Sequence, residues 1–241
     1  MSVLRPGQFD ITDRGIELAG LKSGARVIDI GCGEGDTVHH LEEDCGMKAE
    51  GIDISLSRIA DAKEKFSGID VKFGDGEFMD GYMSYTFDGI FMECSLSHIN
   101  MPDEALHEAY CLLKPGGKLI ISDLYEMEPD RDQMRAVRIE ADRLSRRPHK
   151  EGECDDRGMK FVDFRFGGVF YKDPLIRQLE EIGYHVIGFE DRTQDLDDYI
   201  AKSQADGDKD GLAGLCRDLQ TEIAGRKRRI GYFLLVAAKP L

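Results

Sequence analysis

Three glycines at alternate positions, Gly31, Gly33 and Gly35, follow an apolar stretch in the sequence VIDIGCGEG. Glycine adopts backbone angles that other residues avoid, and it lets a ligand approach the main chain closely. The helix expected after the turn offers unpaired N–H groups at its first residues. This pattern is typical of a strand-to-helix turn that holds a nucleotide at the end of a strand.

The turn does not match the phosphate-binding motifs. Its G-x-G-x-G spacing differs from the dinucleotide fingerprint G-x-G-x-x-G, and no Gly-Lys-Ser/Thr follows, as a P-loop requires. Glu34 and Asp36 stand in the turn, where they would repel a pyrophosphate. Asp29, inside the apolar strand, needs turn amides or a cationic ligand as partners. A nicotinamide-dependent reductase is therefore disfavoured.

Further acidic residues stand where the next two predicted strands end. The second strand, in the stretch AEGIDIS, ends in Asp53, and an acidic residue at this place accepts hydrogen bonds from both hydroxyls of a ribose. Asp75 lies in GDGEF, where it could accept a hydrogen bond from an adenine amino group while the backbone of Gly76 faces the ring. Both positions fit an adenosine ligand.

The elements that position these residues alternate between strand and helix patterns, which predicts a parallel sheet with helices on both faces. The expected strands cover residues 25–31, 49–55, 71–79, 87–99, 118–125, 184–191 and 230–240. The expected helices cover residues 11–20, 36–46, 57–68, 103–117, 173–183, 195–205 and 211–225. Asp173 is expected to cap the helix over 173–183.

The alternation breaks after residue 125, and residues 126–172 are long and highly charged. We expect a lid or substrate-binding insertion here, because long insertions in compact domains are usually functional. A surface helix with a loop is the alternative. Arg165 could bind a carboxylate of an acceptor. The insertion also contains five aromatic residues. They either form an aromatic wall against the acceptor or simply pack in the hydrophobic core: Phe161, Phe164, Phe166, Phe170 and Tyr171.

The stretches VIDIGCGEG, GIDIS, GDGEF, FDGIFMECSLSHI and LLKPGGKLIISD, in this order and spacing, resemble the class I S-adenosylmethionine-dependent methyltransferases. The resemblance is close over residues 25–125 and looser in the final elements. It implies a Rossmann-like, doubly wound α/β sheet of seven strands, mostly parallel, whose antiparallel last strand lies between the fifth and sixth. We therefore expect a single domain over residues 1–241 with the helical insertion as its lid.

The resemblance also implies how the cofactor S-adenosylmethionine would be bound. Asp53 would hold the ribose, Ile54 would pack against adenine, and Phe9 near the N-terminus would close over the cofactor. Asp29 would support the turn. The methionine part would be wrapped by Gly31, Cys32, Gly33 and Gly35.

Two further groups of residues complete the implied site. Asp75 would bind the adenine amino group, with Gly76 and Glu77 lining that end. Glu93 and Cys94 would come close to the methionyl amine and the sulfonium. An acidic lining suits a ligand that carries both a sulfonium and an ammonium cation.

A sulfonium methyl group is already activated, so its transfer depends largely on positioning and on an uncharged nucleophile. His98 is the candidate general base for a hydroxyl or acidic carbon acceptor, and a structural hydrogen bond is its alternative role. Cys94 raises two other hypotheses, attack on a pyrimidine and a trivalent arsenic site shared with Cys154. Glu93 stands where the pyrimidine enzymes have proline, and we prefer a cofactor-lining role for Cys94.

The amino-acid composition limits which binding partners, metal sites and locations are expected. The chain has 47 acidic and 32 basic residues and a formal charge of −15, which disfavours nucleic acid. No apolar run approaches the roughly 20 residues that cross a bilayer, and no secretory signal is visible, so a cytoplasmic protein is expected. None of the six cysteines forms a C-x-x-C pair, so no zinc or iron–sulfur site is expected. The calcium-like pattern at 206–217 lacks an acidic twelfth ligand.

The sequence thus predicts methyl transfer from S-adenosylmethionine to a small-molecule acceptor. Two alternatives stay open. One is methylation of a protein or RNA through a basic groove of Arg135, Arg138, Arg146 and Arg147. The other is a catalytically silent scaffold that binds the cofactor without turnover.

Overall fold

The computed structural model describes residues 5–129, 131, 132, 135, 161, 162, 165, 166, 168–205, 222, 223, 226, 227 and 229–241. The main strands are β1 (Arg26–Ile30), β2 (Lys48–Asp53), β3 (Val71–Phe73), β4 (Phe87–Glu93), β5 (Leu113–Glu126), β9 (His185–Asp191) and β12 (Ile230–Ala238). The helices are α1 (Gln8–Ala19), α2 (Asp36–Glu43), α3 (Leu56–Lys65), α4 (Pro102–Leu112), α6 (Lys172–Ile182) and α7 (Thr193–Ala205), with a 3-10 turn η1 (Leu96–His98) after β4.

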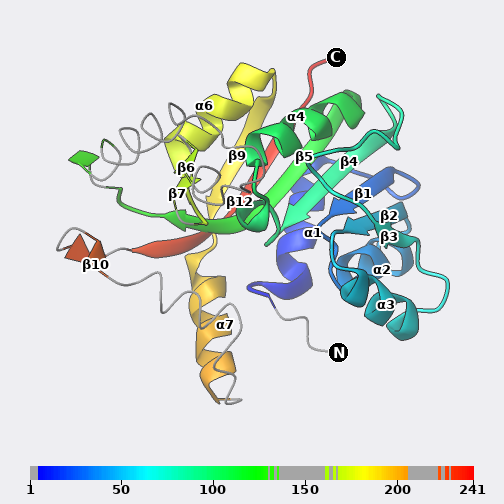
Figure 1. Cartoon of the computed structure of the whole chain (residues 1–241), viewed down its shortest axis with the longest axis horizontal. Helices are drawn as coiled ribbons and strands as arrows, with labels where there is room; N and C mark the ends of the chain where they lie inside the picture. The colour runs from blue at the N-terminus through cyan, green and yellow to red at the C-terminus, as the bar shows by residue number, and fades with distance from the viewer. Residues whose placement is uncertain are drawn as a thin grey trace, which may run out of the picture.

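The main strands form one sheet in the order β3-β2-β1-β4-β5-β12-β9 (Figure 1). The neighbours from β3 to β5 pair in parallel, whereas β12 runs antiparallel to both β5 and β9. The expected doubly wound sheet, with an antiparallel last strand between the fifth and sixth, is therefore confirmed.

Short strands extend this arrangement beside the end of β5. They are β8 (Val169–Tyr171), β7 (Arg165–Phe166) and β6 (Phe161–Val162). β8 pairs in parallel with Tyr125 and Glu126 of β5, so the described end of the expected insertion is joined to the sheet. Farther along the chain, β10 (Glu222–Ile223) pairs with β11 (Arg226–Lys227).

Helices cover both faces of the sheet (Figure 1). One core lies between the sheet and helices α4 and α6, and the other lies between the sheet and helices α1, α2, α3 and α7. Val27 and Ile28 of β1 are neighbours in sequence and belong to opposite cores, because successive side chains of a strand point to opposite faces. Strands buried on both faces explain the nearly continuous apolar runs in the sequence.

Several predicted boundaries were wrong for local reasons. The first helix begins at Gln8 rather than residue 11, after Gly7 with a φ of 69°. β5 begins at Leu113, because the Pro-Gly-Gly sequence that follows cannot continue α4. Asp173 lies in the first turn of α6, whose N-cap is Tyr171. Residues 222 and 223 form a strand where a helix was expected.

The expectation of one domain over residues 1–241 stays a prediction, as does the lid over 126–172, most of which lies outside the described residues. The described part of the chain positions a site nonetheless. The parallel strands end at a common edge, and the strand order reverses between β1 and β4. In open α/β sheets, ligands bind at such a switch point.

Candidate active site

The glycine turn after β1 takes backbone angles that favour glycine. Gly31, Gly33 and Gly35 have φ values of 82°, 53° and 79°. A side chain at Gly31 would also collide with its surroundings, because its Cβ would lie 2.4 Å from the Cβ of Ser95. The Ser95 hydroxyl donates a 2.7 Å hydrogen bond to the carbonyl of Ile30. The turn is therefore packed tightly against the loop after β4.

The same turn is fastened to β2. The N–H groups of Gly31 and Cys32 donate to the carbonyl of Ile52, at 2.8 and 2.9 Å, and the Cys32 side chain is buried. At the next loop of the edge, a Cβ on Gly76 would lie 2.6 Å from Cγ2 of Ile30. Glycine at both loops keeps the backbone close to the sheet edge and leaves room for a ligand.

Asp53 ties the end of β2 to the glycine turn. Its Oδ2 accepts a 2.8 Å hydrogen bond from the N–H of Gly33, and its Oδ1 accepts one of 2.8 Å from the N–H of Ser55. A carboxylate has about four acceptor sites, so lone pairs remain for the hydroxyls of a ribose. The neighbouring side chain of Ile54 is 66 % exposed and presents an apolar surface beside Asp53.

Three buried carboxyl groups gather beneath the turn, from Asp29 of β1, Asp53 of β2 and Glu93 of β4. Burial, followed by the negative charge of Glu93, raises the pKa of Asp29 to about 8, although Arg5 acts in the opposite direction. Among the described residues, Arg5 is the ion-pair partner of this cluster, at Glu93, so one positive charge of the protein faces three carboxyl groups and the ionisation of Asp29 is opposed. The site therefore favours a cationic ligand.

Glu93 is held by residues that the sequence analysis missed. The guanidinium of Arg5 forms a buried ion pair with its Oε2, and the Thr12 hydroxyl donates to Oε1 over 3.1 Å. The Thr37 hydroxyl lies 3.3 Å from Oε2. Arg5 and Thr12 also contact each other, at 2.6 Å. The start of the described chain is thereby joined to the end of β4.

Cys94 stands in a strained position directly after β4. Its φ is 54°. This value is rare for residues that carry a Cβ atom, and residues with such strained backbone angles cluster at active sites. Its Sγ lies 2.8 Å from the Tyr232 hydroxyl, and burial raises the pKa of the thiol to about 12. A protonated thiol is a poor nucleophile. Cys154, the other member of the arsenic hypothesis, lies outside the described residues.

The loop after β3 holds the residues predicted for the adenine end. Oδ1 of Asp75 accepts a 3.0 Å hydrogen bond from the N–H of Glu77. The carboxylate of Glu77 is turned elsewhere, because its Oε1 accepts the N–H groups of Asn100 and Met101 at 2.8 and 3.1 Å. These bonds satisfy donors at the start of α4, whose N-cap residue has no side-chain capping bond. Glu77 thus has a capping role that the sequence analysis did not foresee.

His98 is exposed at the end of η1, on the same edge of the sheet. Beneath it lies Asp123 of β5, which is 1 % exposed and accepts the N–H groups of Ser97 and Leu124 at 2.9 and 2.8 Å. Burial raises the pKa of Asp123, while these N–H groups and the charge of His98 act to lower it. Sequence reasoning did not identify Asp123, although its place at the end of β5 was a usable signal.

Arg165, in the expected insertion, binds the loop after β4 that carries His98. Its buried guanidinium donates to the carbonyls of Ser97 and Ile99, at 3.0 and 2.5 Å. These bonds give Arg165 a loop-positioning contact, and its predicted contact with an acceptor carboxylate stays a prediction. Tyr171 is 2 % exposed, and the side chain of Phe166 lies outside the described residues.

Phe9 is placed on α1, and its ring stacks on that of His40, with 4.1 Å between the centroids and 11° between the planes. The Arg5 guanidinium carbon lies 5.9 Å from the centroid of the Phe9 ring. Phe9 therefore lies beside the buried ion pair and against α2. Its predicted contact with the cofactor stays a prediction.

Comparisons of the sequence with known proteins find methyltransferases. A methyltransferase-domain family model matches residues 21–151. Phosphoethanolamine N-methyltransferase 1 of Zea mays is 26% identical over 237 residues, which are 97% of this chain and 45% of that protein. Arsenite methyltransferase of Aquipseudomonas alcaligenes is 30% identical over 167 residues, 62% of this chain and 44% of that protein. The chain spans less than half the length of these curated relatives.

A solved structure has the same fold. Phosphoethanolamine N-methyltransferase 2 of Haemonchus contortus, in complex with phosphomonomethylethanolamine and S-adenosylhomocysteine, aligns with a TM-score of 0.69 at 18% identity. The alignment covers 99% of this chain and 54% of that chain.

Proposed function

The chain belongs to the methyltransferase-domain family of class I S-adenosylmethionine-dependent methyltransferases, and on this premise we propose that it transfers a methyl group from S-adenosylmethionine to a small-molecule acceptor. The observation that carries the proposal is the cluster of Asp29, Asp53 and Glu93 beneath the glycine turn. Arg5 supplies one positive charge to this cluster, at Glu93, and the sulfonium and ammonium groups of the cofactor would balance the remaining carboxyl groups.

The shape of the sheet edge also fits the cofactor. A Cβ atom at Gly31 or Gly76 would lie only 2.4 or 2.6 Å from a neighbouring atom. Only glycine fits at these two positions, so both loops present their main chain, without a side chain, to the ligand. Asp53 retains acceptor sites for the ribose, and Ile54 offers an exposed apolar contact for adenine. We assign Asp75 to the adenine amino group and Glu93 to the region of the methionyl ammonium.

When bound, S-adenosylmethionine supplies a methyl group on a sulfonium, which is activated without further catalysis. The protein then has to position the acceptor, exclude water and remove a proton where the acceptor carries one. His98 is the proposed base, since it is exposed at the edge while Asp123 and Arg165 fix the loop that carries it. Asp123 and Arg165 are positioning residues in this scheme.

The acceptor is proposed to be a small molecule, since the relatives are named for such substrates. Phosphoethanolamine and arsenite, from the names of the relatives, are the first acceptors to test. For arsenite, the Sγ atom of Cys94 already lies 2.8 Å from the Tyr232 hydroxyl, and Cys154, the second thiol of that hypothesis, lies outside the described residues. We therefore place an amine such as phosphoethanolamine ahead of it.

The two alternative functions, methylation of a protein or RNA and a silent scaffold, require different features of the protein. Methylation of a protein or RNA would use the predicted basic groove, whose arginine side chains lie outside the described residues. A silent scaffold would bind the cofactor without turnover. Among the described helices, none has the length and apolar character needed to cross a bilayer. A cytoplasmic location stays part of the proposal.

The first experiment measures thermal stabilisation by S-adenosylhomocysteine in the wild type and in Asp53→Ala. A ligand at 100 times its dissociation constant stabilises the native state by about 2.7 kcal/mol, and the variant should lose this response. Asp61→Ala, at an exposed position of α3, is the matched control and should keep it. Stabilisation by NADH alone would overturn the cofactor assignment.

Turnover is measured next, as formation of S-adenosylhomocysteine with each acceptor. Methylation of a small amine supports the proposal. Activity confined to a protein or RNA fraction would favour the first alternative, and cofactor binding with no acceptor turned over would favour the scaffold.

A further inference from the structure

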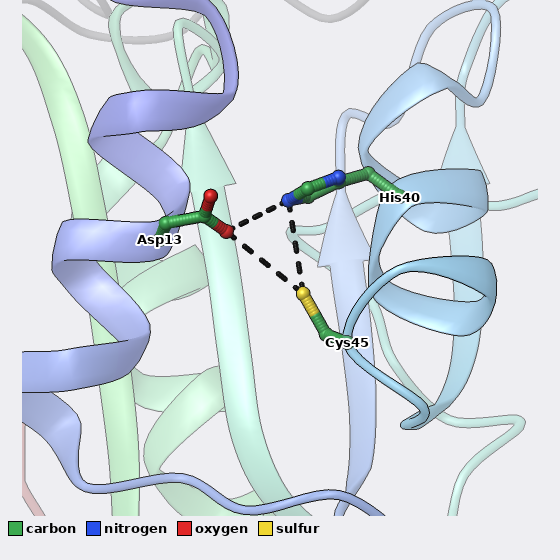
Figure 2. Close-up of side chains that lie close together, drawn as sticks. All are labelled: Asp13, His40 and Cys45. Atoms are coloured by element: carbon green, nitrogen blue, oxygen red, sulfur yellow. Dashed lines mark hydrogen bonds and ion pairs between the residues drawn. The ribbon is translucent and has the colours of Figure 1, made fainter.

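A second cluster of chemically reactive side chains lies away from the glycine turn, where α1 meets the end of α2. Figure 2 shows Asp13 of α1, His40 in the last turn of α2 and Cys45 just after that helix, with their side chains pointing toward one another. His40 is buried, Cys45 is half-buried and Asp13 is exposed. Solvent can therefore reach a cluster whose central ligand is shielded.

The distances in this cluster suit one metal ion. Nε2 of His40 lies 2.8 Å from Oδ1 of Asp13, and Sγ of Cys45 lies 3.7 Å from Nε2 and 3.9 Å from Oδ1. Tetrahedral zinc with ordinary bond lengths places such ligand atoms about 3.3 to 3.6 Å apart. Shifts of about 0.5 Å would give this geometry.

A second carboxylate orients the central ligand. Nδ1 of His40 lies 2.8 Å from Oδ2 of Asp44, so its N–H donates to Asp44 while Nε2 faces the cluster. Metal-binding histidines are usually held in this way, by a hydrogen bond from the nitrogen that does not bind the metal. The backbone fixes the third ligand, because the N–H of Cys45 donates to the carbonyl of His40 over 3.1 Å.

We propose that Asp13, His40 and Cys45 bind one Zn²⁺ ion, with a water molecule as the fourth ligand. A thiolate and an imidazole favour zinc over the hard cations Mg²⁺ and Ca²⁺, which take oxygen ligands. Three protein ligands and one water molecule are also an established coordination for zinc in proteins.

Two protons leave when the ion binds. One is the thiol proton of Cys45. The other is the proton that His40 Nε2 and Asp13 Oδ1 must share in the metal-free protein, since two bare acceptors would repel each other at 2.8 Å. Without metal the thiol is not reactive, because burial and the charges of Asp13 and Asp44 raise the pKa of Cys45 to about 11. The cluster is therefore better suited to metal binding than to nucleophilic chemistry.

The site would join elements that also support the glycine-turn region. Asp13 follows Thr12, whose hydroxyl binds Glu93, and His40 stacks on Phe9. Zinc would fix α1 against α2 through a direct link between the two helices. This role does not depend on the reaction that the protein catalyses.

The test uses the full chain, treated with chelator and then titrated with Zn²⁺ against a chromophoric zinc indicator. We expect one ion per chain and a rise in melting temperature. In Cys45→Ser the dissociation constant for zinc should increase at least tenfold, and Asp13→Asn should weaken binding as well. Asp44→Ala, which removes only the orienting carboxylate, should weaken binding about 10- to 100-fold.

Co²⁺ reports on the ligands directly. The wild type should show the intense visible bands of tetrahedral cobalt and a near-ultraviolet thiolate charge-transfer band, and Cys45→Ser should lose that band. Cys111→Ser, at an exposed cysteine, is the matched control and should retain both signals. Zinc binding that survives both Cys45→Ser and Asp13→Asn would overturn the proposal. So would weak octahedral cobalt spectra, or no binding by a wild type whose circular dichroism shows that it is folded.

Discussion

The Oδ2 atom of Asp53 accepts a 2.8 Å hydrogen bond from the N–H of Gly33. Through this bond, one carboxylate from the end of β2 fixes the turn at the end of β1. The other oxygen of Asp53 is fixed by the N–H of Ser55. A distortion of the glycine turn therefore displaces the carboxylate that we assign to the ribose, and stability and cofactor affinity should change together.

Gly31→Ala should lower both quantities. Alanine at a φ of 82° adopts the left-handed region at a cost of about 1–2 kcal/mol, and its Cβ would lie 2.4 Å from that of Ser95. We expect a loss of about 3 kcal/mol in the free energy of unfolding, measured by urea denaturation. The stabilisation by S-adenosylhomocysteine should be lost as well.

Gly24→Ala is the control that separates backbone strain from the steric collision with Ser95. Gly24 has a φ of 83°, and no atom lies within 4 Å of its Cβ position, so this variant should lose only about 1–2 kcal/mol. The double variant Gly31→Ala/Ser95→Gly removes the collision and should recover part of the loss. Equal losses at Gly31 and Gly24 would contradict the packing that we describe.

Cofactor affinity should depend on pH through Asp29. The pKa of this buried carboxyl group is raised to about 8, so at pH 6 it is protonated in the ligand-free protein. A cationic ligand favours the carboxylate and lowers this pKa, so binding should release up to one proton. The affinity should therefore increase with pH and level off near pH 8. Calorimetry at pH 6.5 in buffers of different ionisation enthalpy measures the protons released.

Asp29→Asn is the control, because it removes the titrating group and should abolish the proton release. The same raised pKa has an opposite effect on stability. Its contribution to stability is fully present below the pKa of the unfolded chain, near 4, and it is lost as pH rises through 8. A pH-independent affinity in the wild type would exclude Asp29 from the cationic site.

Local patterns predicted the fold and the centre of the site. The glycine turn and Asp53 lie within short stretches whose residue types directly determine backbone geometry and hydrogen bonding. The strand order followed from the alternation of elements together with the family resemblance. Gly33 and Asp53 were both predicted as cofactor-binding residues, although the bond between them was not.

Long-range partners could not be predicted in the same way. Arg5 and Glu93 are 88 positions apart, and no spacing rule connects them. The search for C-x-x-C pairs could not detect the proposed zinc site, because its ligands come from α1, α2 and the turn after α2. The capping role of Glu77 was not predicted either, although one signal for it exists: Met101, the N-cap of α4, has no side chain that can cap the helix, so an acceptor from elsewhere is needed.

The buried pair of Arg5 and Glu93 should respond strongly to the loss of one partner. Arg5→Met leaves Glu93 buried without its cation, and such a change costs about 3–5 kcal/mol. The double variant Arg5→Met/Glu93→Gln removes the uncompensated charge and should recover part of this loss. Urea denaturation of the four proteins of the cycle measures the coupling.

Arg14→Met, in α1, provides the comparison with a partly exposed ion pair. Arg14 pairs with Glu190, with side-chain exposures of 36% and 30%, and such partly exposed pairs contribute little to stability. A loss at Arg5 no larger than that at Arg14 would show that the Arg5–Glu93 pair contributes little to stability.

His98→Gln tests the proposed base. Removal of a general base reduces turnover by about 10²- to 10⁴-fold, and formation of S-adenosylhomocysteine with the acceptor measures the loss. The stabilisation by S-adenosylhomocysteine should not change, because His98 lies in η1 beyond the residues assigned to the cofactor. His107→Gln, at an exposed position of α4, should retain full activity. Unchanged turnover in His98→Gln would mean that the acceptor reacts without a base, as an amine that binds in its neutral form can.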